Sequence, residues 1–130
     1  MNALETAVVA AFEANGNAKE ANKAYLEFTK ANLIMPVDAS QAESDNPIPL
    51  FGVDGEEVFV PVFSSDTLFQ DWAKDIQDDI ILFRLSGVDF LKGIGEDIHV
   101  CLNIGAASYK VFNPSEIARM RSIVLKFFRD

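Results

Sequence analysis

Apolar residues recur every three or four positions in several stretches of the chain, which is the pattern of helices that bury one side. The stretches that follow this pattern or carry helix start signals are residues 2–15, 18–31, 66–76, 87–94 and 113–128. Asn2 has Glu5 three positions later, and Asn113-Pro114 is followed by Glu116. Both arrangements are typical of helix N-termini, so they predict where the first and last helices begin.

Short apolar runs between these helices predict the strands of a sheet. The runs are residues 33–35, 48–53, 56–63, 80–83, 98–104 and 109–112. The two runs around Asp54-Gly55 predict a hairpin, because glycine accepts the positive φ that such a turn demands. Pro36 is expected to end the first strand, and the continuous apolar run at 80–83 predicts a strand covered on both faces.

The order of these elements predicts an α+β fold: a mixed β-sheet with β-hairpins and flanking helices. The helical connections after residues 63 and 84 are long enough to join parallel strands, whereas the hairpins are antiparallel. With 130 residues, 49% of them hydrophobic, the chain 1–130 is expected to form a single domain. Residues 38–47 are acidic and polar, which predicts a mobile, solvated loop.

Charge changes this picture at the C-terminal end. The net charge is −9, but residues 110–130 carry five basic and two acidic side chains. The acidic body argues against nucleic acid, whose binding needs a basic surface. The cationic terminal helix either places cations favourably near a helix C-terminus or forms a docking surface for an acidic protein partner. The residues of the docking interpretation are Arg119, Arg121, Lys126, Phe128 and Arg129.

A single cysteine cannot form an internal disulfide, which fits a reducing compartment. The N-terminus has no cationic region before its apolar stretch, and no apolar run approaches the roughly 18 residues of a membrane span. We therefore expect a cytoplasmic protein with no membrane partner.

The one histidine and the one cysteine, His99 and Cys101, lie with Asn103 at strand spacing, so the three are expected to share one face. These residue types can form a cysteine hydrolase site. However, neighbours on one strand face are about 6.5 Å apart, and Asn103 would lie beyond Cys101 instead of behind the histidine. We therefore assign no catalytic residue.

Other chemistry lacks a complete set of residues. One histidine and one cysteine supply two ligands where zinc requires more, and the aspartates near the end of the Trp72 helix do not form a calcium loop. The glycines form no phosphate-binding loop. We expect no metal and no cofactor. Phe69 and Trp72 are interpreted as core residues, with stacking on a small ligand as the alternative.

Three segments resemble, in order, the N-terminal domain of the SseB family, bacterial proteins named for enhanced serine sensitivity. They are LEFTKANLIMPV at 26–37, VFVPVFSSDTLFQDW at 58–72 and HVCLNIGAASYKVFNPSEI at 99–117. The resemblance covers about residues 3–125 and implies an α+β fold in a cytoplasmic bacterial protein. Its motif residues here include Trp72, Asn103 and Gly105, whereas Ile104 stands where the family often has Pro.

The resemblance implies no established reaction, so no catalytic role is carried over. A longer family member would carry a second, C-terminal domain, which this chain is expected to lack. We expect a non-catalytic protein-interaction or regulatory domain that binds an unidentified protein partner, and the docking interpretation of the terminal helix favours an acidic one. The alternatives are a homodimer, a small enzyme using Cys101 and His99, and a binder of a small metabolite.

Overall fold

The computed structural model describes residues 2–15, 17–45, 47–95 and 97–127, apart from the side chains of Asp54 and Phe127. Its helices are α1 (Ala3–Glu13), α2 (Ala18–Lys30), α3 (Asp66–Ala73), α4 (Gly87–Gly93) and α5 (Pro114–Phe127), with a short 3₁₀ turn η1 (Ala39–Gln41). Its strands are β1 (Asn32–Asp38), β2 (Gly52–Asp54), β3 (Glu57–Val62), β4 (Ile80–Ser86), β5 (His99–Leu102) and β6 (Lys110–Phe112). The predicted α+β class with a mixed sheet is confirmed.

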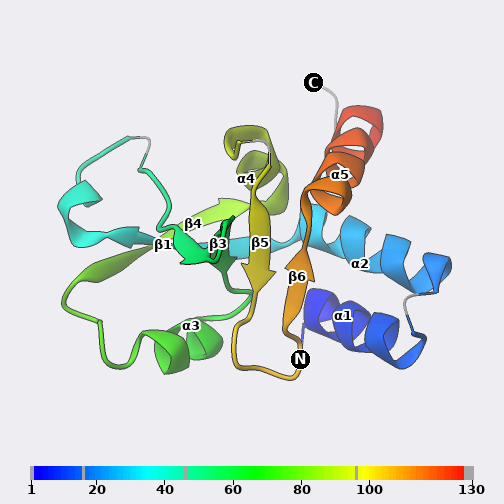
Figure 1. Cartoon of the computed structure of the whole chain (residues 1–130), viewed down its shortest axis with the longest axis horizontal. Helices are drawn as coiled ribbons and strands as arrows, with labels where there is room; N and C mark the ends of the chain where they lie inside the picture. Colours follow the sequence, from blue (N-terminus) through cyan, green and yellow to red (C-terminus); the bar gives the residue numbers. More distant parts are fainter. Residues whose placement is uncertain (1, 16, 46, 96, 128–130) are drawn as a thin grey trace.

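The strands form two sheets (Figure 1). The mixed sheet has the order β2-β3-β5-β6, in which β3 and β5 are parallel and the two outer pairs are antiparallel hairpins. The second sheet is an antiparallel ribbon of β1 and β4, which the sequence did not predict. Backbone hydrogen bonds between Ile34 and Phe63, 2.8 and 2.9 Å long, join the ribbon to the end of β3.

The helical connections after residues 63 and 84 are long enough to join parallel strands, but neither joins a parallel pair by itself. After α3 the chain enters β4, which leaves the mixed sheet to pair antiparallel with β1. The chain returns through α4 to β5, which then pairs in parallel with β3. The parallel connection therefore spans two helices and a strand of the other sheet.

Two predictions about the ribbon are wrong. Pro36 does not end β1, because its backbone nitrogen faces away from β4 and no N–H is needed on that side. The Pro36 carbonyl on the same side accepts a 3.0 Å hydrogen bond from Leu50 N. Nor is β4 covered on both faces: most of its residues are half-buried and Arg84 is exposed.

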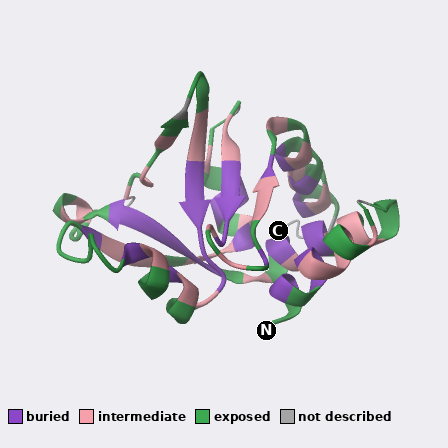
Figure 2. Ribbon diagram, turned by 60° about the horizontal axis from the view of Figure 1, so that its bottom comes forward, coloured by how far each residue is buried: buried purple, intermediate pink, exposed green. Residues whose placement is uncertain are grey.

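Two groups of buried side chains hold the fold together. The larger one packs α1, α2, α4 and α5 against the inner face of the mixed sheet. The smaller one places α3 on the β1–β4 ribbon. Figure 1 shows α1, α2 and α5 together beside β6, with α3 apart from them, and Figure 2 shows that burial is concentrated in the strands and on the inward sides of the helices. None of the helices in the described ranges is long and apolar enough to cross a membrane.

The helix starts follow the predicted capping residues. Asn113 and Glu116 cap α5 reciprocally, with backbone-to-side-chain bonds of 2.9 and 3.2 Å. Asn2 accepts a bond from Glu5 N, but the Glu5 carboxylate does not complete the predicted box, because it binds a distant residue instead. α4 begins where it touches α2: a Cβ on Gly87 would lie 1.9 Å from the carbonyl oxygen of Phe28. Only glycine fits there.

Candidate functional site

A buried polar network joins the Ser64 turn to the end of β5. Ser64 N donates to Asn103 Oδ1 at 2.9 Å, and Asn103 Nδ2 donates to Ser64 Oγ at 2.9 Å and Ser108 Oγ at 3.1 Å. The Ser64 hydroxyl donates to the Glu5 carboxylate at 3.0 Å. Asn103 is fully buried and takes a φ of 54°, a conformation that asparagine tolerates better than most residues. The network therefore holds the Ser64 turn against the end of β5.

The other two motif residues also lie in structural positions. Gly105 has a φ of 90° in the connection from β5 to β6, which favours glycine. The Trp72 ring packs 5.2 Å from the ring of Phe63 and 6.4 Å from that of Phe69, measured between centroids. Trp72 is therefore part of the smaller core group.

The prediction that Asn103 shares a face with His99 and Cys101 is wrong. β5 ends at Leu102, and the positive φ of Asn103 breaks the alternation of faces. Asn103 consequently points into the buried network, and Ile104 lies with His99 and Cys101 around a shallow hollow of about 390 Å³ on the outer face of the mixed sheet. Both amide hydrogens of Asn103 are already bonded to serine hydroxyls, so this side chain does not orient the histidine.

A carboxylate that the sequence did not indicate lies beside the histidine. His99 Nε2 is 3.8 Å from the Glu57 carboxylate, which comes from the neighbouring strand β3. His99 Nδ1 is buried without a hydrogen-bond partner among the described residues. Cys101 is 7% exposed. The sheet thus brings Glu57, His99 and Cys101 to one hollow but leaves the thiol mostly covered.

The cationic surface predicted on the terminal helix is only partly available. Arg121 turns toward α4, where Nε donates to Leu91 O at 2.9 Å and Nη2 donates to Ile94 O and Gly95 O. Arg119 is exposed and lies 6.0 Å from the centre of the Tyr25 ring, and Lys126 is exposed. Phe128 and Arg129 lie outside the described residues. Charge reversal at Arg121 would break contacts with α4, so Arg119→Glu is the cleaner test of a docking role.

Tyr25 links α2 to the start of α5. Its hydroxyl donates to the Glu116 carboxylate at 2.8 Å, and Lys110 Nζ lies 3.0 Å from the same carboxylate. Burial, together with the hydrogen bond and negative charge of Glu116, raises the pKa of Tyr25 to about 12. These contacts tie α2, β6 and α5 together.

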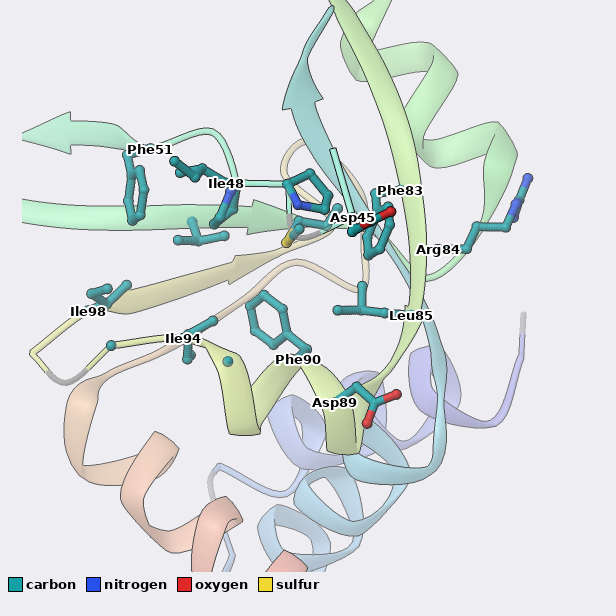
Figure 3. A pocket seen from close by; sticks show the side chains of 16 residues that line it. Asp45, Ile48, Phe51, Phe83, Arg84, Leu85, Asp89, Phe90, Ile94 and Ile98 are labelled. Carbon is teal, nitrogen blue, oxygen red and sulfur yellow. The ribbon is translucent and has the colours of Figure 1, made fainter. Parts of the chain in front are cut away.

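A hollow of about 630 Å³ lies between β4, α4 and the segment that precedes β2. We call it the β4–α4 groove. Most of its apolar lining comes from those three parts of the chain: Phe83 and Leu85, Phe90 and Ile94, and Ile48 and Phe51. Met35, Val60 and Ile98 also line it. Figure 3 shows Phe83 and Leu85 pointing from β4 into the hollow, toward Phe90, while Arg84 points away on the opposite side. The exposed fractions of Ile48 and Phe51 are 61% and 49%, so apolar surface continues out of the groove.

Among the residues that the structure describes, the charged ones that line the groove are Asp45, Asp89 and Arg84. The Arg84 guanidinium binds the Asp66 carboxylate through two contacts of 2.8 and 2.9 Å, which lower the pKa of Asp66 below its ordinary value. Since Arg84 is neutralised by Asp66, the remaining charge at the groove is negative. Within the described residues, no group of three or more histidine, cysteine or acidic side chains is arranged to hold a metal ion.

Sequence reasoning missed the groove because its walls come from segments that are distant in the chain. The one local signal was the run Ile48-Pro49-Leu50-Phe51, in which Pro49 and the preceding Pro47 restrict pairing in a sheet. That signal predicted a strand, and residues 48 and 51 instead lie before β2.

Comparison with known proteins identifies the family. A search of curated proteins found no match, and neither did a search of solved structures. The family model of the SseB protein N-terminal domain matches residues 4–119, which include the Ser64–Asn103 network and every wall of the β4–α4 groove. The chain belongs to the SseB N-terminal domain family.

Proposed function

We propose that this domain is a non-catalytic protein-interaction module and that the β4–α4 groove is its binding site. The observation that carries the proposal is the apolar hollow of about 630 Å³ with Ile48 and Phe51 exposed at its opening. Contiguous apolar surface that stays exposed in a folded domain marks an interaction site more often than scattered apolar residues do. The proposed setting is the bacterial cytoplasm, where a chain with one cysteine needs no disulfide.

The distribution of reactive groups supports a binding role over catalysis. The described lining of the groove contains neither cysteine nor histidine, and its ionisable side chains are Asp45, Arg84 and Asp89. His99 and Cys101 line a different, smaller hollow on the outer face of the mixed sheet. A nucleophile and its base need to be within hydrogen-bond reach in the same site as the substrate.

Gly93 offers a way to block the groove without removing any existing contact. It lines the groove at the end of α4, and a Cβ at this position would have no atom within 4 Å. Gly93→Trp should therefore occupy the groove, and Gly93→Ala is the matched control. In affinity capture from a lysate of the source cells, we expect partners that bind wild type and Gly93→Ala but not Gly93→Trp. A partner list that is the same for all three would refute the groove as the binding site.

A small metabolite is the second candidate for the same groove, because its volume falls within the roughly 300–1,000 Å³ of typical small-molecule sites. A ligand selective for the native state raises the melting temperature. A thermal-shift screen of metabolites should then give hits that Gly93→Trp abolishes and Gly93→Ala keeps. Hits that persist in Gly93→Trp would place the ligand elsewhere.

A further inference from the structure

One edge of β4 has no partner strand within the described part of the chain. In an antiparallel pair, residues alternate between those bonded to the partner and those facing away from it. Ile34 directs both backbone groups to Phe63, and the Pro36 carbonyl accepts from Leu50. Their partners across the ribbon, Arg84 and Leu82, are therefore not bonded to β1. The N–H and C=O groups of these two residues point to the outer edge, where no described residue pairs with them.

This open edge borders the β4–α4 groove. Phe83 and Leu85 alternate with Leu82 and Arg84, and their side chains point into the hollow (Figure 3). An added strand would form hydrogen bonds with Leu82 and Arg84, at positions about 6.8 Å apart along β4. Its side chains opposite Phe83 and Leu85 would point to the same side, so every second residue of the added strand would enter the groove.

The negative charge of the groove favours an added strand that is positively charged. Asp45 and Asp89 line the groove, and the one cation among its described lining residues, Arg84, points away from the hollow and binds Asp66. The whole chain carries a net charge of −9. A segment that carries lysine or arginine beside its apolar residues is therefore favoured electrostatically over an acidic one.

We propose that the β4–α4 groove binds an extended, positively charged protein segment whose apolar side chains alternate, and that this segment pairs with the open edge of β4. The inference rests on the proposed function of the groove and adds the conformation and chemistry of the partner. Hydrogen bonds to Leu82 and Arg84 hold the segment, and the groove selects its apolar residues.

A random library of linear 12-residue peptides, displayed on phage, is the probe. Selection on the wild-type domain should enrich peptides with apolar residues two positions apart and flanking lysine or arginine. Enrichment of apolar residues three or four positions apart would indicate a helical ligand and overturn the edge pairing. Failure to enrich any sequence would overturn it as well.

A selected peptide, made synthetically, then tests the backbone bonds. N-methylation of a residue that pairs with β4 should weaken binding about tenfold or more, whereas N-methylation of its neighbour should not. On the protein, Arg84→Pro removes one outward N–H and is compared with Arg84→Ala, since both lose the Asp66 contact. We expect about tenfold weaker binding for Arg84→Pro than for Arg84→Ala. The methylated peptides give the answer independently if Arg84→Pro does not fold.

The outcomes separate this inference from the proposed function. Peptides that bind Gly93→Trp as tightly as wild type would refute the groove itself. Peptides that need the groove but ignore both N-methylation and Arg84→Pro would leave the groove function standing and refute the edge pairing. A concentration-dependent dimer that Arg84→Pro abolishes would assign the edge to a second copy of the chain and likewise overturn the inference.

Discussion

Removal of the Asn103 side chain should destabilise the domain strongly. In Asn103→Ala, Ser64 N loses its acceptor, and the hydroxyls of Ser64 and Ser108 lose the donor Nδ2. A buried N–H without a partner costs about 2 kcal/mol, and the two lost bonds to hydroxyls add about 1 kcal/mol together. Alanine at a φ of 54° costs about 1 kcal/mol more. The expected loss in the free energy of unfolding is about 4 kcal/mol, a large share of the total for a domain of this size.

Urea unfolding followed by Trp72 fluorescence measures this loss, because Trp72 packs against Phe63 in the core. Asn15 provides the matched control. It also has a φ of 54° and is exposed, and no hydrogen bond of its side chain occurs among the described residues. Asn15→Ala should therefore report the backbone cost alone, about 1 kcal/mol. Asn103→Gly removes that cost and should still lose about 3 kcal/mol. If Asn103→Ala came within about 1 kcal/mol of Asn15→Ala, the network would not stabilise the fold as argued.

Three further predictions follow from local geometry. Gly87→Ala should lower the melting temperature by several degrees, because its Cβ would lie 1.9 Å from Phe28 O, whereas Gly93→Ala should not lower it. Cys101, 7% exposed, should react slowly with iodoacetamide in the native domain and rapidly in urea; fast native reaction would favour the enzyme alternative. The folded state keeps the Tyr25 proton after the unfolded state has lost it, so the free energy of unfolding should fall between pH 10 and about 12. Phenolate absorbance measures the titration, and a Tyr25→Phe variant should lack this fall in stability.

Features set by near neighbours in the chain were predictable from the sequence. Asn113 and Glu116 cap α5 within one turn, and Gly55 takes a positive φ of 64° in the β2–β3 turn. Each of these depends on residues no more than a few positions apart, where backbone sterics and capping bonds decide the outcome. The class of the fold followed from the order of such elements.

Features set by distant contacts were not predictable. The sequence predicted that Pro36 ends a strand. Only the hydrogen bond from Leu50 shows that the Pro36 backbone faces away from β4, where no N–H is required. The sequence predicted that Arg121 is a surface cation. Its hydrogen bonds to the carbonyl groups of Leu91 and Gly95 form only because the C-terminal end of α4 lies beside α5. The groove likewise depends on how the β1–β4 ribbon lies against α4, which no local pattern encodes.

The positions of the motif residues indicate what the family resemblance can and cannot predict. Ser64 and Asn103 lie in two of the three resembling segments, 58–72 and 99–117, and their side chains bind each other inside the fold. Met35 and Val60 of the groove lining, both buried, fall within these segments, but most apolar side chains of the β4–α4 groove come from residues 48–51 and 83–94, outside all three. A chain with the same three segments is therefore expected to have the same fold, because the network requires those residues. Its groove can differ, since neither the network nor the motif constrains those side chains. If the groove is the binding site, partners of SseB-like domains should follow the residues at 48–51 and 83–94 and not the motif.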